Sequence, residues 1–307
     1  MPLIPSPASE LTPRLQGLHL FHFDGAPCAQ RVRFALGEKG LGRGREVKFD
    51  AADASAVIGE EGHWVSRTVS LPRKQHLSQA YAKIHPDMVV PALVHDGRLY
   101  LESMDIITYL DETFAGPRLV PQDAKAEAEA MALVEEAKVL HVSLRYVTFR
   151  WGLGRLAMLN VKEQKRLQEL AANGDDKENL VSFYQAYSGR SIEQSVFDDH
   201  LKKLYGAFAH IESRFGDGRH YLMGDEVSIA DAFWAMKILR LIETGYPIAR
   251  VHPGVYAWYQ RMARRPAFQQ EVMGKNRGNY RFFKAKSSIE NALGLGLNSA
   301  LDRLAIA

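Results

Sequence analysis

Two short segments of the chain carry groups that could bind a small peptide. The first is Val90-Pro91, which opens the apolar run at residues 91–94. A peptide bond before proline is one of the few that can be cis at small cost, and a cis bond here would turn the N–H and C=O of Val90 outward. An extended peptide could then pair with this backbone as an added strand.

The second segment is Glu102-Ser103, which begins a stretch of helical apolar spacing at Ile106, Ile107 and Leu110. A hydroxyl and free backbone N–H groups would stand at the positive end of that helix, where a carboxylate is favoured. Together the two segments predict a site for a short peptide that carries a carboxylate.

A thiol is a third candidate for chemistry. Cys28 is the only cysteine of the chain and stands near the start of a predicted helix at 28–36. The positive end of a helix stabilises a thiolate. A small residue packed against a sheet explains a cysteine at this place equally well, so both interpretations stay open.

The elements that would position these groups follow a β-α-β and then a β-β-α order. Strands are predicted at 18–23 and 46–50, on either side of a helix at 28–36 that Gly40 ends. A hairpin that turns at Asp96-Gly97 joins strands at 91–94 and 99–101, and the helix from Ser103 completes the unit. The pattern predicts helices packed on one small mixed sheet.

The character of the sequence changes after Gly116-Pro117. From about residue 124 nearly every segment has helical spacing. Within this region Ser228 and Asp231 form a capping box, in which each side chain satisfies a backbone N–H of the other residue. We therefore predict an α/β unit followed by an all-α unit.

Composition excludes several classes of protein. A length of 307 residues, 46% hydrophobic and 24% charged, is typical of a soluble protein with two modest domains. A net charge of +3 argues against a nucleic-acid partner, and one cysteine excludes an intrachain disulfide or a cysteine-based metal centre. No apolar run approaches the roughly 18 residues of a membrane span, and residues 1–14 lack the order of a signal peptide. We expect a cytoplasmic protein with no metal, nucleic-acid or membrane partner.

The segment from Ile84 to Ser103 resembles the cytosolic glutathione S-transferase superfamily. The family's run of the type Asn-Pro-x-Gly-x-Val-Pro, a short strand and a Glu-Ser pair before its third helix all have counterparts here, with His85 at the usual asparagine and Met88 at the usual glycine. The resemblance extends over about residues 18–268. It implies the glutathione S-transferase fold, an N-terminal thioredoxin-like domain followed by a C-terminal helical bundle domain.

The same resemblance implies glutathione as cosubstrate. Val90 and Pro91 would hold the backbone of its cysteinyl residue, Ser103 its carboxylate, and Glu102 its amino end. A competing interpretation is that Val90-Pro91 only begins a strand, as it does in thioredoxin-like sheets whatever they bind.

On this resemblance we expect four regions. They are an N-terminal arm, mobile or laid on the surface, at 1–16, a thioredoxin-like glutathione-binding domain at 17–116, an all-helical substrate-binding domain at 124–272 and a C-terminal extension at 273–307. The segment 51–84 carries extra residues that would lengthen the wall beside glutathione, which suits a bulky substrate or a partner subunit. Basic and aromatic residues alternate in the extension, and we interpret them as a helix packed over a domain surface, not as a nucleic-acid site.

The family's catalytic serine or cysteine has no counterpart here, because Ala26 stands at its place. Cys28, two positions on, could donate a hydrogen bond to the glutathione sulfur or form a mixed disulfide with it. The backbone N–H groups of Cys28 and Ala29 could activate the thiolate without any side chain, whereas Pro27 has no N–H to offer.

The whole chain is most similar to the bacterial glutathione-dependent β-aryl etherases of lignin breakdown. The residues that carry this similarity are 90–97, Glu102-Ser103, Tyr109-Leu110 and the long connection through 149–154. It implies that glutathione thiolate attacks the carbon that bears an aryloxy group, beside a ketone, and releases a phenolate. Holding both reactants side by side would supply much of the acceleration.

Aromatic side chains of the helical region would bind the rings of such an electrophile. The candidates are Tyr146, Phe149 and Trp151, with Arg150 or Arg155 to stabilise the phenolate. Packing in the helix core is the alternative role for most of them.

Two other functions remain open. The chain could be a catalytically weak partner subunit of a heterodimeric transferase, or a Cys-type thiol transferase or glutathione lyase that uses Cys28. The family forms dimers about a two-fold axis, so we expect a homodimer or a heterodimer with a homologous transferase.

Overall fold

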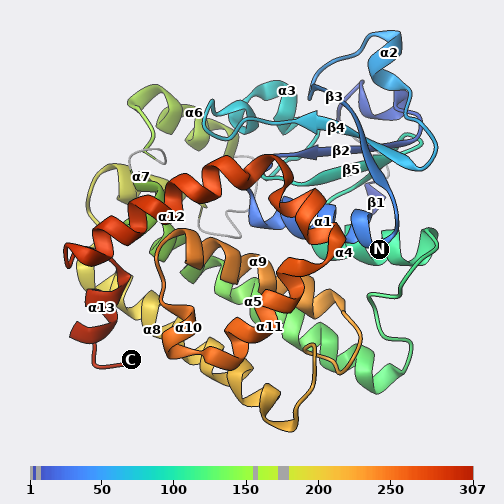
Figure 1. The fold of residues 1–307 in the computed structure, drawn as a ribbon. Helices are drawn as coiled ribbons and strands as arrows, with labels where there is room; N and C mark the ends of the chain where they lie inside the picture. The colour runs from blue at the N-terminus through green and yellow to red at the C-terminus, as the bar shows by residue number, and fades with distance from the viewer. Residues whose placement is uncertain (1–2, 5–7, 155–157, 172–179, 307) are drawn as a thin grey trace. The chain divides into compact units, whose positions relative to one another are not determined.

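The structure, a computed structural model, describes residues 3–4, 8–154, 158–171 and 180–306 (Figure 1). Its contacts divide the chain into two compact units. The first comprises Met1–Pro117 and Met158–Arg190, and the second comprises Arg118–Ala157 and Ser191–Ala307. Residues 158–171 and 180–190 thus belong to the first unit, whereas the sequence predicts a single helical domain at 124–272.

The first unit is built on a six-stranded sheet in the order β1-β6-β5-β2-β4-β3. The strands are β1 (Leu3–Ile4), β2 (Leu18–His22), β3 (Gly42–Lys48), β4 (His63–Thr68), β5 (Ala92–His95) and β6 (Arg98–Tyr100). β2, β3 and β4 are parallel, whereas β5 is antiparallel to β2, β6 to β5, and β1 to β6. The predicted mixed sheet is confirmed.

The hairpin between β5 and β6 turns where the sequence predicts. Asp96 and Gly97 both have positive φ, 46° and 77°, as a two-residue turn of type I′ requires. A Cβ at Gly97 would lie 2.9 Å from the carbonyl oxygen of Pro13, so this position also lacks space for a side chain. The turn fixes a register in which Leu93 faces Tyr100 and Val94 faces Leu99.

Two strands, not one, lie between helix α1 (Pro27–Glu38) and the hairpin. β3 overlaps the expected strand at 46–50 but forms the edge of the sheet. β4, which the sequence pattern assigns to an inserted wall, pairs along its length with β2 in the interior. Its residues 64–67 are all buried, so it shows no alternation of apolar and polar residues. Arg67 is buried because its guanidinium donates to the carbonyl oxygens of Phe49 and Ala51, at 3.1 and 2.8 Å.

Helix α1 begins and ends as its sequence predicts. Ala26 is its N-cap and Pro27 its first residue, where a missing N–H leaves no intrahelical bond unmade. Gly40 has a φ of 71°, and the N–H of Leu41 donates back to the carbonyl of Leu36. The remaining helices of this unit are α2 (Ala54–Val57), α3 (Gln79–Ala82), α4 (Ser103–Thr113), α6 (Val161–Ala171) and α7 (Leu180–Ser188).

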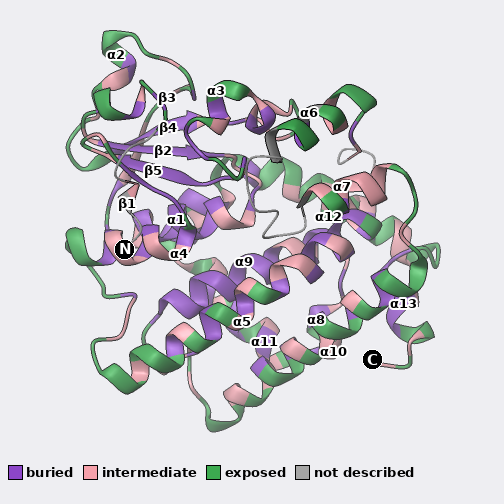
Figure 2. Ribbon diagram, turned by 180° about the vertical axis from the view of Figure 1, so that it is seen from behind, coloured by how far each residue is buried: buried purple, intermediate pink, exposed green. Residues whose placement is uncertain are grey.

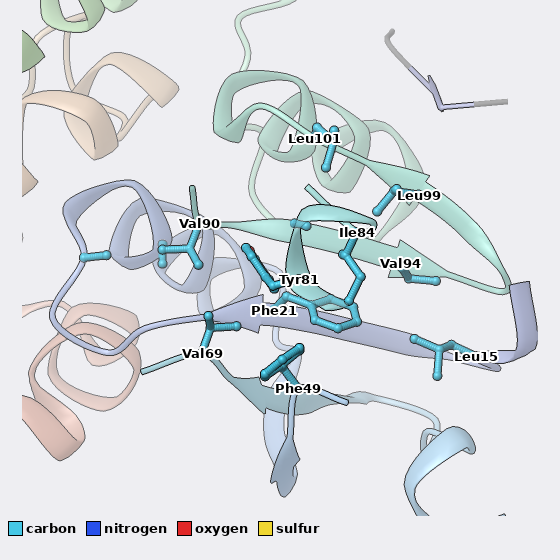
Figure 3. Close-up of a cluster of buried hydrophobic side chains, with 13 residues drawn as sticks. Leu15, Phe21, Phe49, Val69, Tyr81, Ile84, Val90, Val94, Leu99 and Leu101 are labelled. Atoms are coloured by element: carbon cyan, nitrogen blue, oxygen red, sulfur yellow. The ribbon is translucent and has the colours of Figure 1, made fainter. Parts of the chain in front are cut away.

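A hydrophobic cluster of the first unit joins side chains of the strands to those of the connecting segments (Figure 3). Phe21 of β2 and Val94 of β5 lie in it together with Phe49, Tyr81 and Val90. The rings of Phe49 and Tyr81 meet edge to face, with centroids 5.6 Å apart. The segment that leads to Pro91 is therefore held from its apolar side by the core.

A second cluster joins α6 and α7 to the segment before Pro91. Its buried members are Leu77, Met88, Leu159 and Leu167, with partly buried residues of α3 and α7 packed against them. Part of the expected wall at 51–84 is thus covered by helices that come from a distant part of the chain.

The expected N-terminal arm is partly built into the sheet. β1 pairs with β6, so that Leu3 faces Tyr100 and Ile4 faces Leu99. Thr12 and Leu15 are also buried. Apolar side chains at both ends of this segment account for its attachment. Of the two expected forms of the arm, these residues agree with a segment laid on the unit.

The second unit is built from helices. They are α5 (Ala124–Thr148), α8 (Gln194–Arg214), α9 (Ile229–Glu243), α10 (Ile248–Val251), α11 (Pro253–Arg264), α12 (Arg277–Ala292) and α13 (Leu297–Arg303). Nearly every residue of α9 is buried (Figure 2). The predicted capping box is present, and the Asp231 carboxylate also accepts a 2.8 Å hydrogen bond from the indole of Trp258. Across the described ranges, no helix combines the length and the apolar character that crossing a membrane would need.

Candidate functional site

The backbone before Pro91 is available for pairing. The Val90–Pro91 bond is cis, as expected, and the Val90 side chain is buried in the core cluster of Figure 3. Within the part of the chain that the structure describes, no hydrogen bond engages the Val90 N–H or C=O. The preceding carbonyl, that of Val89, accepts a 2.7 Å hydrogen bond from the Tyr81 hydroxyl. The Val90 side chain and the Val89 carbonyl are therefore held by the first unit. The N–H and C=O of Val90 can still pair with an added strand.

Ser103 is the first residue of α4 and is buried. Its N-cap residue, Glu102, is exposed and has a φ of 61°. The Glu102 side chain does not cap this helix end, and the N–H groups of Ser103 and Met104 precede the hydrogen bonds of the helix. A hydroxyl and helix N–H groups therefore stand together where a carboxylate would be stabilised.

These two segments flank the same β5–β6 hairpin. Leu93 faces Tyr100 across β5 and β6, and the pairing runs antiparallel. Val90 and Ser103 each lie three residues beyond Leu93 and Tyr100, the last paired residues at this end of the hairpin. One hairpin therefore positions both the strand-like edge and the helix start.

The start of α1 supplies further N–H groups. The first intrahelical bond runs from the N–H of Gln30 to the carbonyl of Ala26, so the N–H groups of Cys28 and Ala29 precede the helical ladder. The side chains of Ala26 and Ala29 lie in the core cluster. Cys28 is half-buried. The groups that this helix start could offer to a ligand are therefore the N–H groups of Cys28 and Ala29 and the Cys28 sulfur.

Two arginines of α1 support this turn, and the sequence pattern gives neither of them a role. The guanidinium of Arg31 donates a 2.8 Å hydrogen bond to the Cys28 sulfur. The fully buried Arg33 donates to the carbonyl oxygens of Phe23 and Asp24, at 3.3 and 2.8 Å. The first arginine thus holds the Cys28 sulfur, and the second fixes the turn that leads into the helix.

His85 and Met88, the two departures from the family pattern, both face the interior of the first unit. Met88 has a φ of 54° and lies in the cluster with Leu77 and Leu159. Burial lowers the pKa of His85 to about 4, so this side chain is neutral at physiological pH. Neither residue offers a charge to a ligand.

The four aromatic and basic candidates of the second unit lie at the end of α5. A π-helical turn over Phe149–Leu153 holds Phe149, Arg150 and Trp151, and such turns recur at functional sites. Phe149 and Trp151 are mostly buried, Tyr146 is half-buried and Arg150 is exposed. Arg155 lies outside the described residues.

Contacts with α8 join these side chains into one group. The Tyr146 ring stacks on that of His200, with centroids 4.0 Å apart, and the ring of Phe197 meets those of Tyr146 and Trp151 at 5.9 and 6.4 Å. The Arg150 guanidinium lies 5.5 Å from the centre of the Trp151 ring. The structure thus brings together three of the predicted residues, Tyr146, Arg150 and Trp151, in an aromatic group with a cation at its edge.

Comparisons with known proteins agree with this fold. The family description "Glutathione S-transferase, N-terminal domain" matches residues 20–118, and "Glutathione S-transferase, C-terminal domain" matches residues 194–261. The chain is 28% identical over 231 residues to Glutathione S-transferase 1 of Dianthus caryophyllus, covering 75% of this chain and 80% of that protein. It is also 28% identical over 228 residues to Protein LigF of a Sphingobium species, covering 70% and 86%.

A solved structure, that of the beta-etherase LigF from Sphingobium sp. strain SYK-6, superposes with a TM-score of 0.67 at 21% identity, over 83% of this chain and 98% of that one. At this level of identity the superposition shows the fold.

Proposed function

The chain belongs to the glutathione S-transferase family, and on this premise we propose that it transfers glutathione to an aromatic electrophile, with lignin-derived β-aryl ethers as the favoured substrates. The cosubstrate glutathione follows from the family. Similarity to Protein LigF at 28% identity, together with the likeness in fold to the beta-etherase LigF, supports the finer choice of substrate. We also propose the cytoplasm as its location.

The observation that carries this proposal is the register of the β5–β6 hairpin. The backbone of Val90 precedes this hairpin by three residues from its last pair, and Ser103 at the start of α4 follows it by three residues. A tripeptide with a backbone to pair and a carboxylate to neutralise fits that pair of groups. We assign Val90 and Pro91 to the cysteinyl part of glutathione, Ser103 to its carboxylate, and Glu102 to its amino end.

The reaction itself needs a thiolate near neutral pH. After the glutathione thiol has released its proton to solvent, the N–H groups of Cys28 and Ala29 and the positive end of α1 would stabilise the sulfur anion. The sulfur forms a bond to the carbon that carries the aryloxy group, the carbon–oxygen bond breaks, and its electron pair leaves with the phenolate oxygen. No oxidant or reductant is consumed.

The second unit supplies groups suited to the other reactant. The half-buried Tyr146 would offer its ring to the substrate, and Arg150 would offer a charge that stabilises a departing phenolate. Trp151 is mostly buried and would support Arg150. Phe149 is mostly buried and would act by supporting these rings.

Two measurements test the proposal. Calorimetric titration with glutathione should give saturable binding, and a fluorogenic β-aryl ether should release its phenol only when glutathione is present. Mass spectrometry of the other product should find a glutathione thioether. Binding without phenol release would contradict the etherase assignment alone, whereas failure to bind glutathione would contradict the assignment of the site.

One contact favours a second function. The Arg31 guanidinium donates a 2.8 Å hydrogen bond to the Cys28 sulfur and so holds that sulfur in place near the start of α1. In a thiol transferase Cys28 would attack the sulfur of a glutathione mixed disulfide, release the substrate thiolate and itself become the mixed disulfide, which a second glutathione would reduce. We rank this function below the etherase, because Cys28 is half-buried and the Ala26 side chain lies in the core.

A further inference from the structure

The last helix of the chain is fastened to the start of α8. Both terminal nitrogens of the Arg303 guanidinium donate to the Asp198 carboxylate, at 2.6 and 2.9 Å. Asp198 is mostly buried, and the pKa of its carboxyl is lowered first of all by this hydrogen bond from Arg303. A two-pronged, charge-assisted contact of this kind fixes orientation as well as distance.

Hydrogen bonds of the first turn of α8 connect Asp198 to Arg150, one of the candidate substrate residues. The Gln194 side-chain amide donates to the Asp198 carboxylate at 2.9 Å, and its carbonyl oxygen accepts a 2.9 Å hydrogen bond from the guanidinium of Arg150. Arg303, Asp198, Gln194 and Arg150 therefore form an unbroken chain of hydrogen bonds. We refer to these four residues as the tail relay.

The same turn of α8 also touches the aromatic group. Phe197, beside Asp198, meets the rings of Tyr146 and Trp151. The N-cap of α8, Glu193, contributes no side-chain cap to the first turn. Arg303 therefore binds the end of α8 that makes both the hydrogen bond to Arg150 and the ring contacts to Tyr146 and Trp151.

We propose that Arg303 is a positioning residue for the aromatic electrophile, acting through the tail relay to hold Arg150 beside Trp151. This inference rests on the proposed function, because the substrate role of the π-helical turn is part of that proposal. Arg303 touches neither glutathione nor the reacting atoms in this assignment. Its removal should therefore weaken binding of the electrophile more than it slows the chemical step.

The chain offers a matched control for the test. Arg250 also holds α13, through an ion pair with Asp302 at 3.3 Å, but this pair is not part of the tail relay. Arg250→Gln should loosen the attachment of α13 without reaching Arg150. Arg303→Gln likewise removes one positive charge from an ion pair that attaches α13, but it also breaks the tail relay.

Two readouts separate the outcomes. We expect Arg303→Gln to raise KM for the β-aryl ether about three- to tenfold, the range for a partly exposed charge-assisted contact, with little change in kcat or in KM for glutathione. Arg303→Lys, which keeps the charge without the fork, should lie between Arg303→Gln and wild type. Gln194→Leu should resemble Arg303→Gln, and Arg250→Gln should resemble wild type.

The second readout needs no turnover. Arg303→Gln should change tryptophan emission in the wild-type background and leave it unchanged in a Trp151→Phe background, because Arg150 lies against Trp151. Unchanged emission, or equal effects of Arg303→Gln and Arg250→Gln, overturns the tail relay. An emission change in a protein that never cleaves the ether supports the relay and contradicts the proposed function alone.

Discussion

The hydroxyl of Tyr81 donates a 2.7 Å hydrogen bond to the carbonyl of Val89, one residue before the backbone that we assign to glutathione. Tyr81 is fully buried, and burial raises the pKa of its hydroxyl well above the ordinary value, so this group remains a neutral donor. The contact joins a helical turn of the long connection after β4 to the candidate binding edge.

Tyr81→Phe should therefore affect both stability and binding. We expect the free energy of unfolding to fall by about 1 kcal/mol, because the Val89 carbonyl loses its buried donor. Affinity for glutathione should fall as the neighbouring Val90 backbone loses a fixed position. Denaturant unfolding and calorimetry measure the two effects. Wild-type values in both would show that the hydrogen bond does not position this edge.

Ser103→Ala should weaken glutathione binding by roughly 1 to 3 kcal/mol, the cost when a buried carboxylate loses a hydroxyl donor. Thr108→Ala is the matched control, because it removes a hydroxyl from the same helix away from its start. Calorimetry on both variants makes the comparison. Equal affinities would place the carboxylate site elsewhere.

Cys28→Ser separates the two enzyme classes. Ether cleavage uses the thiolate of bound glutathione, to which a serine hydroxyl can still donate, so the variant should keep glutathione binding and most etherase activity. Disulfide exchange requires the Cys28 sulfur as nucleophile and should be weak in both proteins. Loss of all activity, with a glutathione adduct on the wild-type chain by intact mass, would favour the thiol transferase.

Acid should destabilise the first unit through His85. Its pKa is lowered by burial from 6.5 to about 4, so between these values the unfolded chain binds a proton that the folded chain does not. The free energy of unfolding should therefore be highest above pH 6.5 and should fall as the pH approaches 4, by up to about 3 kcal/mol for this residue. His85→Asn should flatten that slope. Identical slopes in wild type and His85→Asn would contradict the assignment.

We predict that the chain is a dimer in solution, as the family resemblance implies. Light scattering at micromolar concentration should give twice the mass of 34.5 kDa. A homodimer is the expected form. A protein that dimerises well only with a co-expressed homologue would support the partner-subunit alternative, and a monomer would contradict the prediction.

Local signals accounted for the parts of the fold that the sequence predicted well. The hairpin depends on Asp96-Gly97 and the start of α4 on Glu102-Ser103, so adjacent residues suffice to define them. The residues assigned to the glutathione and substrate sites stay predictions.

Long-range contacts account for what the sequence pattern missed. β4 contains Arg67, whose charge suggests a surface position, yet carbonyl oxygens elsewhere in the chain accept its hydrogen bonds. Arg303 and Asp198 are 105 residues apart, and no periodicity connects them. The role of Tyr81 likewise depends on where folding places Val89. Patterns of neighbouring residues carry no information on such pairs.

Residues 158–171 and 180–190 belong to the first unit, and this limits where the chain can be cut into fragments. A fragment that stops at Pro117 would leave Leu77 and Met88 without Leu159 and Leu167, and the uncovered apolar surface would promote association with other chains. An exchange of the N-terminal half with that of a relative would create the same defect. The two halves matched by the family descriptions are therefore not interchangeable modules in this chain, and any chimaera must carry the segment 158–190 together with the thioredoxin-like part that it covers.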